Sequence, residues 1–325
     1  MNSSNDSTIT IDFRQLLRDE KAKAKAKAKA KAKAKLGSID TSTSPISNHN
    51  PCFHSTATTT STTSTSTNID YWKPMNLKDE SIPPSITISK QITSITYIPK
   101  FLPLPFSNQL LTWLQSLPTF QQTTKPNQKD DYYDHIGKWT VLQHAKRKVC
   151  LFDTTQRQPS ITTAVPIPIP IQQIIDKCQP YFSKPPNHIL INEYQPGQGI
   201  LFHTDGPQYH PQTMTISIGG THVLFHFQKP KYSNFDIGSS KTTSECVFVS
   251  GHGSCLFFEK DAYTYYHHGI HEVIEESITS NTCMNYNDYM DSVHQYNNHE
   301  DTKQNVLVRG YRISLTIRHK YTNDH

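Results

Sequence analysis

The stretch RGYRISLTIRHK, residues 309–320, alternates strictly in character along its centre. Polar side chains occupy every second position, at Arg312, Ser314, Thr316 and Arg318. Apolar side chains occupy the positions between them, at Ile313, Leu315 and Ile317. A period of two predicts a β-strand with one apolar face and one cationic, hydroxyl-lined face. Taken alone, such a strand is typical of a half-solvated sheet face, so its role depends on what surrounds it.

Further short strands precede this one, separated by turns that contain Gly and Pro. They are predicted over residues 188–194, 213–218, 222–227, 245–249 and 254–258, with the last strand over 311–318. One short helix is predicted to begin at Ser107 as its N-cap, and another over 171–182 with a break near Pro180. The pattern predicts a mainly β (α+β) domain, a sandwich or jelly roll with flanking helices.

A candidate metal site lies in two other segments, NEYQPGQGILFHTDG at 192–206 and AYTYYHHGI at 262–270. His203 and Asp205 are two residues apart, so an extended backbone places both side chains on one face. A histidine from the second segment, such as His268, would complete two imidazoles and one carboxylate, the ligand set of non-haem Fe(II) oxygenases. A chain with 17 histidines contains some H-x-D pairs by chance, and His267 and His271 remain alternatives to His268.

Arg312 and Arg318 supply a candidate anion clamp on the polar face of the last strand. A guanidinium is planar, always charged and able to bind both oxygens of a carboxylate. Two such groups beside an iron suggest a dicarboxylate co-substrate.

Together the three segments resemble AlkB-type 2-oxoglutarate and Fe(II)-dependent dioxygenases, most closely the subgroup of the sixth AlkB homologue, over roughly residues 87–322. The motif H-x-D-G-P-x-Y of that subgroup reads here from His203 to Tyr209, and A-Y-T-x-x-x-H-G-I reads from Ala262 to Ile270. The resemblance implies a double-stranded β-helix. It implies these iron ligands: His203, Asp205 and His268. It implies these 2-oxoglutarate contacts: Asn192, Tyr194, Arg312, Ser314 and Arg318.

The resemblance also implies the chemistry. Fe(II), 2-oxoglutarate and dioxygen would serve as cofactor and co-substrates, 2-oxoglutarate would become succinate, and hydroxylation of an N-methyl group would release formaldehyde. Both ligand histidines have to be neutral to bind metal, so activity should fall at acidic pH. No catalytic residue beyond the metal site is implied.

The substrate is expected to be an alkylated nucleic-acid base, DNA or RNA, which relatives hold in a pocket built by the segment before the core. Here that segment is roughly residues 138–159, and Lys138, Trp139, Thr140 and Leu142 match the subgroup. It departs from the subgroup at Leu151 and Phe152, where an amide is missing. The basic run of residues 146–148 could meet phosphates or form a solvated loop.

Two alternatives stay open. A protein hydroxylase or demethylase would use the same iron chemistry on a different polymer. A sensor would bind iron and 2-oxoglutarate without turnover.

Composition divides the chain in two. Residues 1–86 contain a perfect Lys-Ala alternation at 21–35 and a Ser/Thr-rich stretch at 41–67, and are expected to be a disordered arm. This arm holds 12 Lys and Arg against 8 Asp and Glu, so it carries +4 of the net +5. The dioxygenase domain is expected over 87–325, with a polar surface insertion at 277–305. Its net charge of +1 excludes a broadly basic body.

We expect a monomeric intracellular protein of the cytoplasm or nucleus. No early charged and apolar pattern resembles a secretory signal, and no apolar run is long enough to span a bilayer. The six cysteines show no zinc-type spacing and are expected to be reduced thiols.

Overall fold

The computed structural model describes most of the predicted domain, at residues 72, 77, 86–87, 92–121, 135–142, 147–155, 167–229, 246–296 and 306–321. The predicted arm therefore lies outside the described residues, apart from positions 72, 77 and 86. Trp72 and Leu77 contact the domain: the indole of Trp72 donates to Gln173 Oε1 at 2.8 Å, and Leu77 is buried in the main core.

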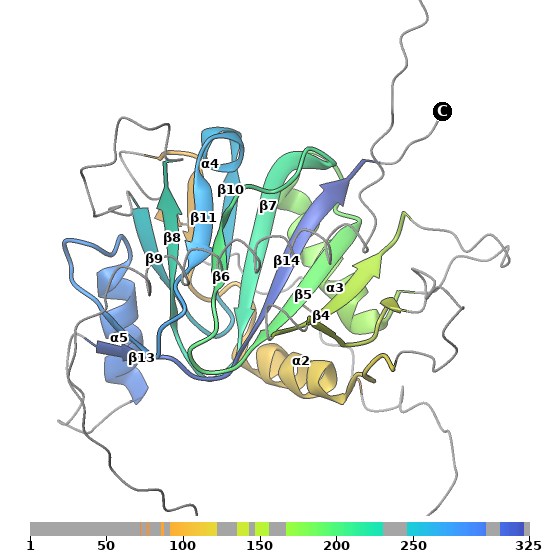
Figure 1. Cartoon of the computed structure of the whole chain (residues 1–325), viewed down its shortest axis with the longest axis horizontal. Coiled ribbons are helices and arrows are strands. Elements are labelled where there is room, and N and C mark those ends of the chain that lie inside the picture. The colour runs from red at the N-terminus through yellow and green to blue at the C-terminus, as the bar shows by residue number, and fades with distance from the viewer. Residues whose placement is uncertain are drawn as a thin grey trace, which may run out of the picture.

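A large antiparallel sheet forms one layer of the molecule (Figure 1). Its order is β1 (Ile86–Thr87), β2 (Ile95–Ile98), β10 (Cys255–Glu259), β7 (Tyr209–Ile218), β14 (Arg312–Lys320), β5 (His188–Tyr194), β4 (Arg147–Asp153) and β3 (Thr140–Leu142). The strand that contains the alternating arginines, β14, lies in the middle, between β7 and β5.

The second sheet has four strands, in the order β6 (Ile200–His203), β11 (His267–Ile270), β8 (Val223–Gln228) and β9 (Cys246–Ser250). Along the chain, strands from β5 to β11 pass repeatedly between the two sheets. This topology confirms the predicted jelly roll, and each predicted strand is present to within a few residues.

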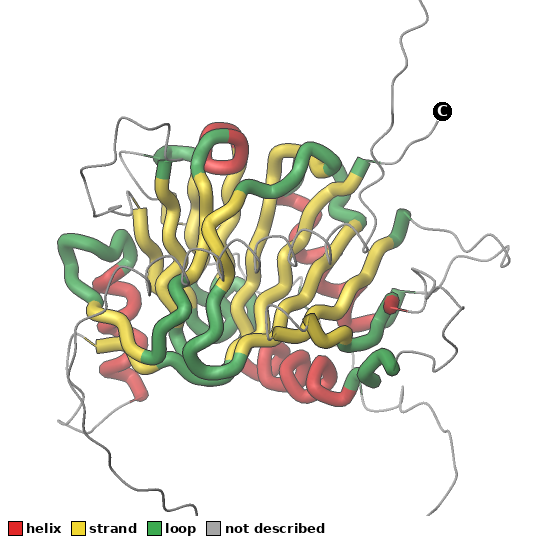
Figure 2. Tube along the Cα trace, viewed as in Figure 1, coloured by secondary structure: helices red, strands yellow, loops and turns green. Residues whose placement is uncertain are grey.

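Helices cover the outer face of the large sheet (Figure 2). They are α2 (Leu104–Ser116), α3 (Ile169–Cys178) and the 3-10 turn η2 (Gln179–Tyr181). Their apolar sides pack on Ile313, Leu315 and Ile317, the apolar positions of the alternating strand. Burying this face is what turns the polar face of β14 toward the other sheet.

The prediction of Ser107 as an N-cap was wrong. Helix α2 begins at Leu104, after Pro103, because the fixed φ of proline suits a helix start. Ser107 lies inside the first turn, fully buried, and donates to the carbonyl of Leu102. The second helix also begins two residues early, and the predicted break near Pro180 is confirmed by η2.

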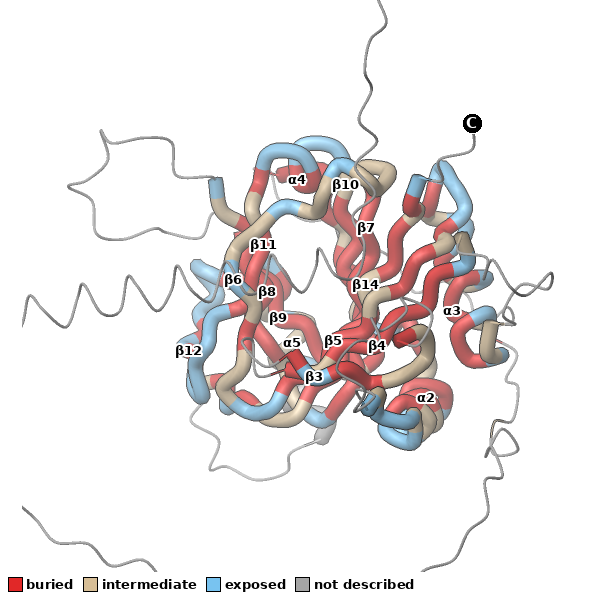
Figure 3. The backbone as a smooth tube through the Cα atoms, turned by 45° about the vertical axis from the view of Figure 1, so that its right-hand side comes forward, coloured by how far each residue is buried: buried red, intermediate tan, exposed pale blue. Residues whose placement is uncertain are grey.

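Aromatic and aliphatic side chains fill much of the space between the sheets, so that strands of both are buried over most of their length (Figure 3). This cluster includes Phe225, Phe227 and Phe258, and the short helix α4 (Lys260–Thr264) closes one end of it. The packing leaves the polar ends of β7 and β14 facing β6 and β11.

The predicted insertion contains structure that the sequence pattern did not indicate. The strand β12 (Glu275–Ser277) pairs with β13 (Val306–Val308), and α5 (Tyr286–Tyr296) lies between them in the chain. Ile278 and Cys283 are buried against the outer face of β8 and β9. Within the described residues, no helix has the length and apolar character needed to cross a bilayer.

Candidate metal centre

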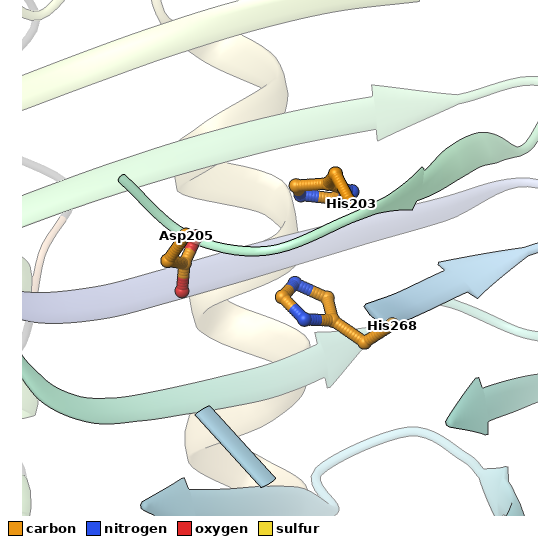
Figure 4. A group of neighbouring side chains, drawn as sticks. All are labelled: His203, Asp205 and His268. Carbon is orange, nitrogen blue, oxygen red and sulfur yellow. The ribbon is translucent and has the colours of Figure 1, made fainter. Parts of the chain in front are cut away.

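His203, Asp205 and His268 converge at one end of the small sheet (Figure 4). His203 ends β6, Asp205 follows two residues later, and His268 lies on β11 directly opposite His203 in the antiparallel register. Each residue offers one ligand atom, and these atoms all lie within 4.8 Å of one another. In the described part of the chain this is the one such group of three.

The two histidine rings are held by different means. The Nδ1 of His203 lies 2.7 Å from the carbonyl of Leu201, which makes that nitrogen the proton donor and leaves Nε2 as the electron-pair donor. His268 lies against Phe258, with ring centroids 4.9 Å apart, and stacks on Phe225. Burial lowers the pKa of His268 to about 3, and the charge that His203 can carry is the second cause of this shift. The ring of His268 is therefore neutral at ordinary pH.

Both carboxylate oxygens of Asp205 are bound by the large sheet. Arg318 Nη1 lies 2.6 Å from Oδ1, and the hydroxyl of Thr213 donates to Oδ2 at 2.6 Å. Burial would raise the pKa of Asp205, but Arg318 and the two histidines outweigh it and hold the pKa well below its usual range. The carboxylate is therefore ionised, as a metal ligand has to be.

These three residues fit a divalent metal. Two neutral imidazoles and an ionised carboxylate on one side are the donor set of Fe(II) sites with open positions. In addition, the Nδ1 of His268 is buried and has no hydrogen-bond partner among the described residues. A buried nitrogen without a partner is costly, and a metal bound through this nitrogen would remove that cost.

Arg312 is the second notable charge. Its guanidinium is buried, its Nε and Nη2 donate to Ser217 Oγ at 3.3 and 2.9 Å, and it lies over the ring of Tyr194 at 5.4 Å. Burial lowers the pKa of Arg312 to about 10, so it is charged at neutral pH. No carboxylate of the described residues pairs with it, which leaves a buried cation able to take an anionic ligand.

The remaining predicted co-substrate residues lie on the same inner face. Ser314 is paired in register with Asn192 on one side and Ser217 on the other, and Arg312 is paired with Tyr194. Asn192 is buried, and its Oδ1 accepts from Arg147 Nε at 3.2 Å. The structure thus brings the predicted set together, while its contact with 2-oxoglutarate stays a prediction.

The two alternative histidines lie away from this group. His267 precedes His268 on β11, so its side chain points to the opposite face. His271 follows the strand, and its ring centroid lies 4.5 Å from that of His226.

Three contacts were missed by sequence reasoning: Thr213, Ser217 and Arg147. Thr213 and Ser217 had a signal, because hydroxyls alternate along 213–217 with apolar residues between them. Arg147 belongs to the basic run that was expected either to meet phosphates or to form a solvated loop, but it is buried against Asn192. Lys148, next to it, pairs with Glu193 at 3.0 Å, and residue 146 lies outside the described part.

Comparison with known proteins agrees with this centre. The chain is 35% identical over 144 residues to a zebrafish (Danio rerio) protein named "Probable RNA/DNA demethylase ALKBH6". The aligned region covers 43% of this chain and 55% of that protein. The chain thus spans about half the length of this curated relative. The predicted resemblance to AlkB-type proteins is confirmed at the level of sequence similarity.

Solved structures align with much of the chain at low scores. OsALKBH1 gives a TM-score of 0.38 at 15% identity, covering 69% of this chain and 97% of that one. An oxidoreductase of the 2OG-Fe(II) oxygenase family from Burkholderia pseudomallei gives 0.38 at 10% identity, covering 71% and 86%. The family model described as "2OG-Fe(II) oxygenase superfamily" matches residues 94–318, which include all three proposed metal ligands. The chain belongs to the 2OG-Fe(II) oxygenase superfamily.

Proposed function

We propose that this protein is an Fe(II)- and 2-oxoglutarate-dependent dioxygenase that removes a methyl group oxidatively from an alkylated nucleic-acid base. The observation that carries the proposal is a two-histidine, one-carboxylate group whose ligand atoms lie within 4.8 Å of one another, together with a buried arginine of the large sheet that has no acidic partner among the described residues. A metal ligand set at the small sheet and an anion site on the inner face of the large sheet are what a dicarboxylate co-substrate bound to both requires.

Each residue has a defined task in this proposal. His203, Asp205 and His268 would hold Fe(II) from one side. Arg312 would bind the distal carboxylate of 2-oxoglutarate, with the predicted contacts Asn192, Tyr194 and Ser314 around it. The metal, when bound, supplies the redox chemistry that couples oxidation of 2-oxoglutarate by dioxygen to hydroxylation of a substrate C–H bond.

Arg318 would act mainly through Asp205. Its guanidinium is bound to the aspartate and lies 4.0 Å from the ring of Tyr209, which fixes both the charge and the direction of the carboxylate. A carboxylate fixed in this way keeps the ligand geometry from collapsing when the metal is absent. Any contact of Arg318 with the co-substrate would be additional.

The nucleic-acid substrate is supported by the name of the zebrafish relative, a probable RNA/DNA demethylase. It is supported also by the resemblance of Lys138, Trp139, Thr140 and Leu142 to the AlkB segment that is expected to hold the base. Methylated DNA, methylated RNA and methylated peptides can be compared directly, since all three release formaldehyde when demethylated.

We further propose an intracellular, monomeric protein of the cytoplasm or nucleus. The five cysteines within the described residues, at positions 150, 178, 246, 255 and 283, are buried and form no disulfide. Reduced thiols and a need for Fe(II) both suit a reducing compartment.

The test is succinate formation from 2-oxoglutarate by purified protein with Fe(II) and ascorbate, first alone and then with methylated single-stranded oligonucleotides. His203→Ala and Arg312→Ala should each lower turnover by more than about 100-fold, beyond the roughly 10–100-fold typical of outer-shell partners. His267→Ala is the matched control, since its ring faces away, and should keep turnover within about twofold. Wild-type protein that binds neither Mn(II) nor 2-oxoglutarate would overturn the proposal.

A further inference from the structure

Arg312 differs from Arg309 and Arg318, two other buried arginines of the domain, in how its charge is balanced. Arg318 forms an ion pair with Asp205 at 2.6 Å, and Arg309 forms one with Glu276 at 3.0 Å. Arg312 is as deeply buried as these two, yet its hydrogen-bond acceptors among the described residues are hydroxyl groups. A buried cation with neutral acceptors is stabilised in position without being neutralised.

Two hydroxyls bond Arg312, those of Ser217 and Tyr194. Ser217 begins a chain of three buried serines, Ser217, Ser250 and Ser254, called the serine chain below. Ser217 Oγ lies 2.7 Å from Ser250 Oγ, which lies 3.1 Å from Ser254 Oγ. The hydroxyl of Ser254 donates to the carbonyl of Gly251 at 2.8 Å and accepts from the Gly251 N–H at 3.0 Å. All three serines are about 1% exposed.

The direction of these bonds follows from the charge at one end. Ser217 accepts two N–H groups from the guanidinium, so its single proton has to be donated onward, to Ser250. The proton of Ser254 is directed at the Gly251 carbonyl, which leaves its oxygen lone pairs for Ser250 and Gly251 N–H. Every oxygen in the serine chain therefore presents lone pairs toward Arg312, and aligned hydroxyls strengthen one another.

The serine chain also connects the two sheets. Ser217 belongs to β7 of the large sheet, Ser250 ends β9 of the small sheet, and Ser254 lies in the turn that precedes β10. It fixes the edge of the guanidinium formed by Nε and Nη2, and it leaves Nη1 unassigned by the serines. The donor capacity that Ser217 and the hydroxyl of Tyr194 leave open is where a carboxylate can bind.

Resting on the proposed function, we propose that the serine chain positions Arg312 and keeps its charge uncompensated, so that the site selects 2-oxo acids with a second carboxylate. Ser217 is then a positioning residue for the clamp, and Ser250 acts through Ser217. An acidic residue at position 217 would neutralise Arg312 and abolish this selection, although it would leave the metal ligands unchanged.

The experiment measures anaerobic binding of two probes to Mn(II)-loaded protein by calorimetry. The probes are 2-oxoglutarate and 2-oxobutyrate, which share the 2-oxo acid end and differ in the distal carboxylate. Ser217→Ala should weaken 2-oxoglutarate binding by about tenfold, since hydrogen bonds to charged groups contribute most, and change 2-oxobutyrate binding by less than about twofold. Ser250→Ala should act in the same direction by about threefold.

Two further variants make the result specific. Ser217→Asp should abolish the preference for 2-oxoglutarate over 2-oxobutyrate. Ser107→Ala is the matched control, because Ser107 is equally buried but its hydroxyl bonds a carbonyl under α2, and it should leave both affinities unchanged. If Ser217→Ala does not fold, as judged by circular dichroism, Ser250→Ala carries the same test.

Four results would overturn the inference. Equal losses for both probes in Ser217→Ala would indicate general disturbance of the site. Unchanged affinity for 2-oxoglutarate in Ser217→Ala and Ser250→Ala would show that the serine chain has no such role. Wild-type protein that binds both probes equally well would remove the selectivity itself, whereas wild-type protein that binds no 2-oxoglutarate would overturn the proposed function and this inference with it.

Discussion

At the residue scale, Asp205 depends on two strands of the opposite sheet for its orientation. Arg318 and Thr213 lie in register as neighbours on β14 and β7, and each binds one oxygen of the carboxylate. Without them the side chain could rotate away from the two histidines. Outer partners of this kind typically change metal affinity by roughly 10–100-fold.

Removing the hydroxyl of Thr213 should therefore weaken the metal site. We expect Thr213→Val to lower Mn(II) affinity by about tenfold, measured by anaerobic titration without co-substrate. Thr215→Val is the control, because Thr215 lies on the same face of β7 two positions along from Thr213, the residue whose hydroxyl binds Asp205. An affinity equal to that of the wild type in Thr213→Val would show that Arg318 alone orients the carboxylate.

His188 provides a prediction about pH. It is buried on β5, and burial together with the charge of Arg318 lowers its pKa from 6.5 to about 3. The unfolded chain then binds a proton that the folded protein does not bind between these values, so the contribution of His188 to stability is lost as pH falls below about 6.5. We expect the free energy of unfolding to fall between pH 7 and pH 5 by on the order of 1–2 kcal/mol more in wild-type protein than in His188→Gln.

Urea unfolding at both pH values measures this difference. The other histidines are present in both proteins, so the comparison isolates position 188. A wild type and variant that lose the same stability would contradict the assignment of a neutral buried ring.

At the scale of elements, β9 is an edge strand of the small sheet and is covered by the insertion. The side chain of Asn285 accepts from the Val249 N–H at 2.8 Å and donates to the Val249 carbonyl at 2.8 Å. It thus replaces the pairing that a further strand would give, and protects an open edge from other chains.

We expect Asn285→Ala to lower the free energy of unfolding by about 2–4 kcal/mol. Two buried backbone groups each lose a hydrogen-bond partner, which costs about 1–3 kcal/mol per group, and part of this cost is recovered. Chemical denaturation measures the change. Asn281→Ala is the matched control, since Asn281 is exposed in the same insertion and should change stability by less than about 0.5 kcal/mol. A small effect at both positions would mean that water readily hydrogen-bonds the backbone N–H and carbonyl of Val249 in place of Asn285.

At the scale of the whole molecule, the proposed ligands bridge two layers. The metal ligands lie on or beside the small sheet, and Arg312 with its neighbours lies on the large sheet. A group bound to both would stabilise the folded state over the unfolded state by mass action.

Mn(II) and 2-oxoglutarate should therefore raise the melting temperature together more than Mn(II) does alone. At about 100 times the dissociation constant, a ligand adds roughly 2.7 kcal/mol. Thermal scans of wild-type protein and Arg312→Ala test this, and the variant should retain the response to Mn(II) and lose the response to 2-oxoglutarate. An equal 2-oxoglutarate response in both proteins would place the co-substrate elsewhere.

The sequence by itself determined where the strands lie, which side chains point to the same face of a strand, and which residues are candidate ligands. The alternation over 312–318 and the H-x-D pair at 203–205 are local patterns, and side-chain direction along an extended backbone follows from two-residue periodicity. For this reason β5 was predicted with its observed bounds, and His203 and Asp205 were correctly expected to share a face. The start of α2 was missed because the prediction depended on Ser107, whereas the helix begins directly after Pro103.

Only the tertiary structure decided which faces meet. Ser217 lies 95 residues from Arg312 in the chain, and Arg318 lies 113 residues from Asp205, so neither contact has a local signature. The same holds for α5, whose polar sequence shows little sign of the buried residues that anchor its segment on β8 and β9. Long-range strand pairing brings these groups together, and burial then makes their charges and hydrogen bonds matter, because an unpaired group is costly only away from water.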